Sequence, residues 1–189
     1  MTYIKLFLIS IVCLLALSVK GQNASVERSI FNIQAGTFGI WINNEAKLSN
    51  HIALKSELGL DAGIFGGSLY EKTGFLLTPV ITLEPRWYYN INKRNSHSKN
   101  ISGNSANFLS LKTSYNPDWF IISNADNLKV VNQISMIPTW GIRRVIGKHF
   151  NYEAGFGIGY RYIFAKSAGY LQDESEVAVN VHLRIGYKF

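Results

Sequence analysis

The chain has 189 residues and a mass of 21.3 kDa, of which 47% of residues are hydrophobic, 13% aromatic and only 16% charged. This length suits a single domain with a core, and many aromatic residues with little charge exclude an intrinsically disordered protein. The mean hydropathy of +0.05 is low for a helical membrane protein and high for a soluble one, so composition alone leaves the class open.

The first 21 residues are typical of a secretory signal peptide. Lys5 supplies a positive charge, residues 6–19 are uncharged and mostly apolar, and small residues precede a cleavage position after Gly21. The apolar run is shorter than the ~20 residues of a spanning helix, which makes a retained anchor the alternative. We therefore expect residues 1–21 to be removed and residues 22–189 to form the mature domain.

Removal of this segment changes the chemistry of the chain. It takes away Cys13, the only cysteine, and lowers the net charge from +7 to +5 because Lys5 and Lys20 leave with it. An exported chain without disulfides indicates a bacterial envelope protein rather than a small secreted eukaryotic domain. Its mild positive balance does not indicate a nucleic-acid partner.

The mature sequence alternates apolar and polar residues with the period of a β-strand. In chain order, the alternating segments are residues 36–48, 52–62, 75–91, 109–115, 134–142, 150–164 and 177–189. No segment has a convincing helical period. The charged residues in or directly beside these segments all fall on the face opposite the apolar one: Glu45, Lys47, Lys55, Glu57, Asp61, Glu84, Arg86, Lys112, Arg143, Glu153, Arg161, Arg184 and Lys188.

Three features favour a membrane barrel with its apolar face outward over a soluble sandwich. Several segments exceed the ~9–11 residues that a strand needs to cross a bilayer. The polar face carries small residues that suit a narrow lumen, namely Gly39, Gly59, Gly141, Gly155, Gly157, Gly159 and Gly186. Aromatic residues lie near segment ends, as in interfacial girdles: Trp87, Tyr88, Tyr89, Tyr160, Tyr162, Phe164, Tyr187 and Phe189. The sequence therefore predicts an all-β, antiparallel up-and-down transmembrane β-barrel of about eight strands.

Two details of this barrel need further prediction. Seven strands are clear, and an even count requires an eighth, which we place either in residues 119–131 or in residues 29–34. Pro79, Pro85 and Pro138 lie inside predicted strands although proline removes a ladder donor, so we expect β-bulges there.

The chain resembles the small outer-membrane β-barrel proteins of Gram-negative bacteria, in a largely uncharacterised branch. The resemblance rests on the final alternating strand ending Arg-Ile-Gly-Tyr-Lys-Phe (184–189) and on residues 82–90 and 138–144. It implies a location in the outer membrane, with outer-membrane lipids and lipopolysaccharide as surroundings. It also implies that Tyr187 and Phe189 form the C-terminal signal that the barrel assembly machinery recognises.

The candidate site is a network of lumen charges, because an unpaired charge inside a narrow barrel is costly. Its members are Lys55, Glu57, Glu84, Arg86, Arg143, Glu153, Arg161 and Arg184. They can form a gate or selectivity ring, or a structural plug. We favour the plug, since eight strands leave an interior just filled by side chains.

Two loops offer other contacts. Residues 85–117 contain five bases and no acid, and their middle, 92–106, is a polar loop that either contacts anionic head groups or a polyanionic partner, or is simply solvated. Residues 116–133 either expose a ligand contact or hide the eighth strand.

Catalysis finds little support. His51, His97, His149 and His182 are scattered without metal-ligand spacing, and no motif indicates a cofactor. We expect a non-enzymatic outer-membrane barrel that acts as a structural, binding or narrow-channel component, and the oligomeric state stays open. One alternative is a secreted lipocalin-like binder of an apolar ligand, suggested by Gly39-Ile40-Trp41. Another is a membrane-embedded lipid-modifying enzyme.

Overall fold

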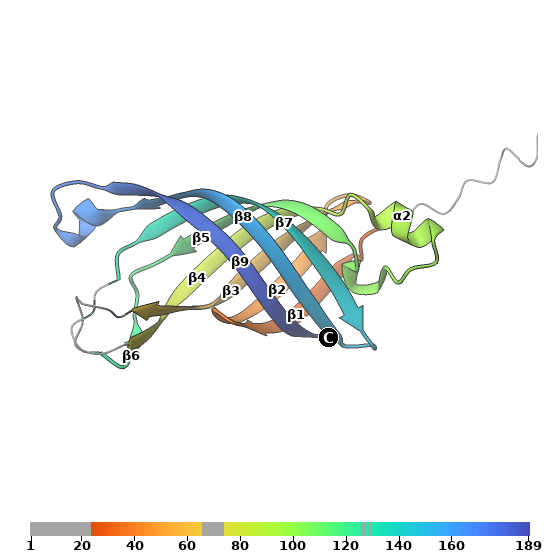
Figure 1. The fold of residues 1–189 in the computed structure, drawn as a ribbon, viewed down its shortest axis with the longest axis horizontal. Coiled ribbons are helices and arrows are strands. Elements are labelled where there is room, and N and C mark those ends of the chain that lie inside the picture. Colours follow the sequence, from red (N-terminus) through yellow and green to blue (C-terminus); the bar gives the residue numbers. More distant parts are fainter. Residues whose placement is uncertain (1–23, 66–73, 126–127, 129) are drawn as a thin grey trace, which may run out of the picture.

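The computed structural model describes residues 24–65, 74–125, 128 and 130–189. Within these residues, eight antiparallel strands form a sheet that closes on itself (Figure 1). The strands are β1 (Ser29–Gly36), β2 (Gly39–Lys47), β3 (Ile52–Phe65), β4 (Gly74–Trp87), β5 (Asn107–Asn116), β7 (Gln133–Ile146), β8 (Phe150–Ile163) and β9 (Glu174–Lys188). Consecutive barrel strands pair with each other, and β9 pairs with β1 to close the ring. The predicted all-β, up-and-down barrel of eight strands is confirmed.

The two ends of the barrel differ. At one end, which we call the capped end, lie residues 24–28, the C-terminus and the 88–106 segment with helix α2 (Ile91–Ser96) and the short 3-10 helix η1 (Ser102–Asn104) (Figure 1). At the other end, which we call the mouth, lie the turn at residues 37–38, residues 117–125 and 130–132, and a loop at 164–173. Residues 117–125 contain the two-residue strand β6 (Ile122–Ser123), which pairs with β4, and the 164–173 loop contains the 3-10 helix η2 (Ala165–Ala168).

The eighth strand is β1, at the second of the two predicted positions. Its Phe31 and Ile33 face outward, while Asn32 and Gln34 are buried inside. β1 joins β2 through a two-residue turn in which Gly36 pairs with Gly39, so the predicted first segment is in fact the end of one strand and the whole of the next. Residues 119–131, the other predicted position, contribute only β6 among the described residues.

The β-bulges predicted at the prolines are wrong for these strands. Partners advance one for one through Leu60–Pro79 and Leu54–Pro85 in the β3–β4 pair, and through Leu111–Pro138 in the β5–β7 pair. The pairing with the other neighbour is interrupted instead: the β4–β5 ladder skips Pro85, and the β7–β8 ladder skips Pro138. Because proline lacks an N–H, the hydrogen-bond ladder on one side of the strand has a local gap, while the register of the strand pair stays the same.

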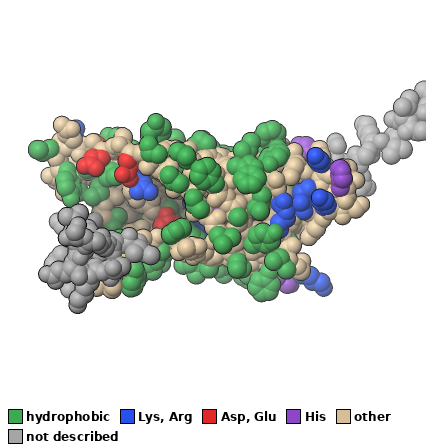
Figure 2. All heavy atoms as spheres, viewed as in Figure 1, with side chains coloured by type: hydrophobic (Ala, Val, Ile, Leu, Met, Phe, Trp, Pro, Cys, Tyr) green, Lys and Arg blue, Asp and Glu red, His purple; other side chains and the backbone are tan. Residues whose placement is uncertain are grey.

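The apolar faces of the strands point outward, as predicted, and the charged faces point inward. Large apolar side chains such as Val181 (57% exposed) lie on the outer surface, and they cover the middle of the barrel in Figure 2. Buried positions inside the barrel carry amides, hydroxyls and charges. The polarity of this barrel is therefore the reverse of a globular domain, in which the apolar groups are inside.

The main apolar cluster lies at the capped end rather than in the barrel. Tyr88 and Phe108 meet edge to face there, with ring centroids 5.7 Å apart. The other members are Ala24, Val26, Ala53, Ile91 and Ala106. Two predictions fail at this point: Tyr88 belongs to no outer girdle, and the predicted strand to residue 91 ends at Trp87. The chain turns inward at Tyr88, and Ile91 begins α2 under the cap, because these apolar groups gain more from covering the barrel end than from continuing the wall.

The predicted signal peptide and Cys13 lie outside the described residues. Among the residues that the structure does describe, no helix is long and apolar enough to cross a membrane.

Inner-face glycines make room for large side chains, as the sequence predicts. Gly141 pairs with Phe108 across β5 and β7, and a Cβ at Gly141 would collide with the Phe108 ring. Gly59 lies against the indole of Trp41 in the same way. The wall therefore reserves space for two interior aromatic rings.

We predict that Gly141→Ala destabilises the barrel by about 1–3 kcal/mol, because the added methyl group displaces the Phe108 ring from a fully packed site. The free energy of unfolding is measured by urea titration in detergent. Gly147→Asn is the control: Gly147 has a φ of +64° in a turn with nothing within 4 Å, and asparagine tolerates this conformation. Equal losses in the two variants would contradict the close packing of Phe108 on Gly141.

Candidate functional site

Eight buried charged side chains fill the middle of the barrel, and we call them the ion-pair plug. They are Glu45, Lys55, Glu57, Glu84, Arg86, Arg143, Glu153 and Arg184, all 4% exposed or less. Seven of them are predicted site residues. The eighth prediction, Arg161, lies at the mouth, where its half-exposed side chain pairs with Glu176 at 3.1 Å. It is outside the plug because its position on β8 is near the strand's mouth end.

Arg86 and Arg143 organise the layer of the plug nearest the cap. Arg86 Nη1 and Nη2 donate to the two carboxylate oxygens of Glu153 at 2.8 and 3.1 Å, and Nη2 also donates to Glu84 at 2.8 Å. Arg143 Nη1 donates to Glu45 at 2.7 Å. The two-point contact between Arg86 and Glu153 fixes both groups, since it matches the planar guanidinium to the carboxylate.

The cap contacts this layer directly. The Tyr88 hydroxyl donates to Glu45 Oε1 at 2.7 Å, and the Arg86 guanidinium lies 4.3 Å from the centre of the Phe108 ring. Asn104, from η1, also donates to Glu45. Burial, and then the nearby Glu45 carboxylate, raise the pKa of Tyr88 well above its ordinary value, which keeps its hydroxyl a donor. The cap therefore supplies neutral donors and a cation–π contact to the charges beneath it.

A second layer lies nearer the mouth. Glu57 Oε2 lies 2.5 Å from Lys55 Nζ and 2.6 Å from Arg184 Nη1. The Arg184 guanidinium stacks 3.6 Å from the centre of the Trp41 ring, and Lys55 also donates to the Gln34 amide oxygen at 3.3 Å. These contacts join β1, β2, β3 and β9.

The charges balance over the whole plug but not within each layer. Four carboxylates face four cations, which fits the rule that charges removed from water must be paired. The layer nearest the cap has Glu45, Glu84 and Glu153 against two arginines. Nearer the mouth, Lys55 and Arg184 both contact the single carboxylate of Glu57, and Lys55 also lies opposite Glu84 across β3 and β4.

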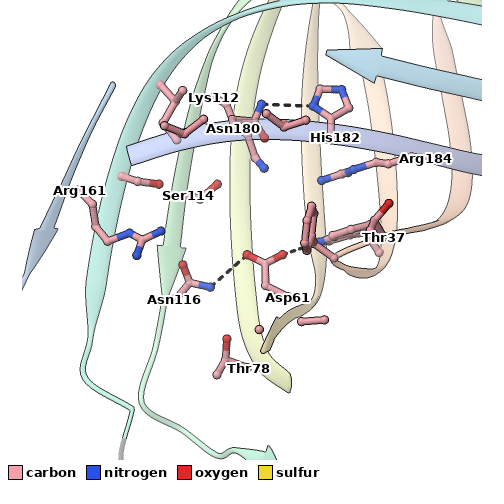
Figure 3. Close-up of a pocket in the computed structure, with 18 of the residues that line it drawn as sticks. Thr37, Asp61, Thr78, Lys112, Ser114, Asn116, Arg161, Asn180, His182 and Arg184 are labelled. Carbon is pink, nitrogen blue, oxygen red and sulfur yellow. Dashed lines mark hydrogen bonds between the residues drawn. The ribbon is translucent and has the colours of Figure 1, made fainter. Parts of the chain in front are cut away.

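Beyond the second layer lies a cavity of about 500 Å³, which we call the mouth cavity (Figure 3). Its lining is part polar and part apolar, and its polar members include Asp61, Thr78, Lys112, Ser114, Asn116 and His182. Arg184 and Trp41 line it as well, so the second layer of the plug borders it. Figure 2 shows the surface hollowed near this end of the barrel.

The predicted network omits Glu45, Asp61 and Lys112, although all three lie on the polar strand faces. Their position in the alternating pattern is enough to predict that these three side chains point into the barrel. What the sequence does not provide is the height of each residue along the barrel axis, which separates the plug residues from the cavity residues and from Arg161.

The remaining predicted residues lie elsewhere. Tyr187 and Phe189 are on the outer surface at the capped end, with ring centroids 5.1 Å apart, and Phe189 also packs on Phe31 at 5.7 Å. Of the four histidines, only His182 lines the mouth cavity. Within the described part of the chain, no group of three His, Cys, Asp or Glu side chains is placed to hold a metal ion.

Comparison with known proteins adds no family. No family model matches the chain, and neither a curated protein nor a solved structure matches it. The site is therefore interpreted from its geometry.

We predict that Glu153→Gln costs about 3–5 kcal/mol of unfolding free energy, because it breaks the two-point contact of Arg86 and leaves the whole plug with four buried cations against three carboxylates. Glu176→Gln removes the same charge from an exposed Arg–Glu pair and is expected to cost less than about 1 kcal/mol. Urea titration of both variants in the same detergent measures the difference. Similar losses would show that the buried pairs contribute no more than the exposed one.

Proposed function

We propose that this chain is an integral outer-membrane β-barrel with a closed lumen, acting as a non-enzymatic structural or binding component. The observation that carries the proposal is the combination of an apolar outer belt with an ionised interior. In a water-soluble barrel this arrangement would expose apolar groups to solvent and bury charges, both at a cost in free energy. Hydrocarbon around the barrel removes the first cost.

The outer belt has the composition of a lipid-facing surface. Ile158, Val179, Val181 and Leu183 are 54–60% exposed on adjacent strands, and they lie within an extended apolar area. β3, β4, β7 and β8 each have 14 residues, and β9 has 15. Strands of this length exceed the ~9–11 residues that cross a hydrocarbon layer.

Side chains at the ends of the belt also support a membrane setting. At the capped end, the Trp140 indole donates to the Tyr89 hydroxyl at 2.9 Å on the outer surface, as amphipathic rings do at an interface. Arg94 and Arg144 lie near each other beyond these rings, and Figure 2 shows basic side chains grouped at this end. Such bases suit anionic lipid head groups. On this proposal, phospholipids and lipopolysaccharide surround the barrel.

The C-terminal strand supports the proposed route of assembly. Tyr187, on the outer face of β9, is 40% exposed, and Phe189, directly after β9, is 66% exposed. A terminal strand with outward aromatic residues is accessible to the barrel assembly machinery before the barrel closes. We propose these two residues as the recognised signal.

The interior argues against an apolar-ligand carrier. A lipocalin-like binder needs an apolar cavity inside the barrel. Here the centre holds the ion-pair plug, and the mouth cavity places Asp61, Lys112 and hydroxyl groups beside its apolar lining residues. The Gly39-Ile40-Trp41 motif places Trp41 inside the barrel. There the Arg184 guanidinium stacks on the Trp41 ring, so this ring does not face an open apolar cavity as a ligand-binding tryptophan would.

We predict that Val181→Arg lowers folding into lipid vesicles by about 2–4 kcal/mol, the cost of a charge near the middle of the lipid-facing belt. Val181→Leu should leave folding unchanged, and Leu171→Arg, at a mouth-loop residue that is 95% exposed, should do the same. The folded fraction is read from heat-modifiable migration on gels. A Val181→Arg protein that folds like wild type, in vesicles and in detergent-free buffer, would instead support the soluble lipocalin-like barrel.

We also predict no stable open channel in planar bilayers, because the eight plug charges and the apolar cap occupy the path between the two ends. Single-channel recordings of the purified full chain test this, with an open porin in the same membrane as the positive control. Reproducible conductance steps would contradict the closed lumen and favour a narrow channel.

A further inference from the structure

The mouth cavity contains a cation without a partner. Lys112, on β5, lines the cavity and is half-buried. Among the residues that the structure describes, its ammonium group forms no hydrogen bond or ion pair, whereas the other cations lining the cavity are paired. A lysine in such a place is an available donor for an anion.

The other charged groups of the cavity are already engaged. Asp61 accepts hydrogen bonds from the Trp41 indole N–H at 2.9 Å and the Asn116 amide at 3.4 Å (Figure 3). Arg161 pairs with Glu176 at the rim, and Arg184 pairs with Glu57. Asp61 is therefore held by neutral donors from the wall, and it leaves the charge of Lys112 uncompensated by a contact.

The surroundings of Lys112 contain charges of both signs. Arg184 repels Lys112, while the carboxylates of Glu57, Asp61 and Glu84 attract it without contacting its ammonium group. Lys112 and Arg184 both line the cavity, and no carboxylate of the described residues contacts the Lys112 ammonium group, so an anion in that space meets two cations.

Two further polar atoms of the lining residues have no hydrogen-bond partner in the part of the chain that the structure describes. Arg184 Nε and His182 Nε2 are buried without a hydrogen-bond partner among the described residues. Hydroxyl and amide groups of Thr78, Ser114 and Asn180 also line the cavity. A cavity of about 500 Å³ is large enough for a small solute, and this lining suits one with hydroxyl groups as well as a charge.

We propose that the mouth cavity binds a small hydroxylated organic anion, a sugar acid or sugar phosphate, with its charged group on Lys112 and its hydroxyls on the polar wall. This inference goes beyond the proposed function, because it concerns the interior and holds whether lipid or water surrounds the barrel. Its failure would therefore leave the membrane proposal untouched.

A ligand series of constant ring and varied charge tests the proposal. Isothermal titration of the full chain in a non-ionic detergent at low salt compares glucuronate, glucose and glucosamine, with glucose 6-phosphate as the phosphate arm. We expect glucuronate or glucose 6-phosphate to bind about tenfold or more tightly than glucose, and glucosamine to bind most weakly. Equal binding of all four sugars, or no binding of either anion, overturns the proposal.

Variants locate the charge that is responsible. Lys112→Gln should reduce the affinity for the anion to that for glucose, and Lys112→Arg should retain most of the preference. Lys166→Gln removes the same charge from the mouth loop outside the cavity and should change the affinity less than about twofold. An unchanged preference in a folded Lys112→Gln protein assigns the anion to another place and overturns the role of Lys112. If that variant does not fold, the wild-type series decides alone.

Discussion

The structure depends on the pairing of charges in the middle of the barrel, where side chains fill the interior. An eight-stranded barrel has an interior just filled by side chains, so each buried charge must meet its counterpart within the wall. Glu45 and Arg143 are 98 residues apart in the chain, and Glu57 and Arg184 are 127 apart. These contacts exist only after the last strands have joined the first ones. Closure of the barrel and neutralisation of its interior are therefore one event, and neither is stable without the other.

The contents of the barrel are ordered along its axis. The apolar cap around Tyr88 and Phe108 comes first, then a layer with more carboxylates than cations, then a layer with more cations, and last the mouth cavity. The cap contributes to this order because Tyr88 and Asn104 donate to Glu45 and stabilise the acidic layer from outside. With negative charge held at the cap, the positive excess faces the mouth. The separation of negative charge toward the cap and positive charge toward the mouth therefore follows from the position of the hydrogen-bond donors in the cap.

The period of two predicted most of the wall, because a strand buried on one face places similar residues at every second position. It missed β1 as a certain strand, since Ile30 is buried beside the polar Asn32 and Gln34 and blurs the alternation. It also extended β4 through Tyr88 to Ile91, because a chain that turns inward can keep an alternating sequence. The alternating pattern alone was enough to predict which residues point into the plug, but not which of them pair with each other. Pairing depends on strand order, stagger and height, and Arg161 shows that the correct phase does not ensure the correct height.

A barrel sealed in its middle can bind a solute from one side, but it cannot pass that solute on. A continuous water path would need to replace contacts such as those between Arg86 and Glu153, and each replacement would leave charges without partners of equal strength. The apolar cap closes the far end a second time. The mouth cavity is thus a dead end, and the residence of a solute in it is set by its contacts with groups such as Lys112 and Asn180. On the proposal that this cavity binds an anion, selectivity is a property of binding, because the cation that is unpaired among the described residues lies in the cavity and not in the plug.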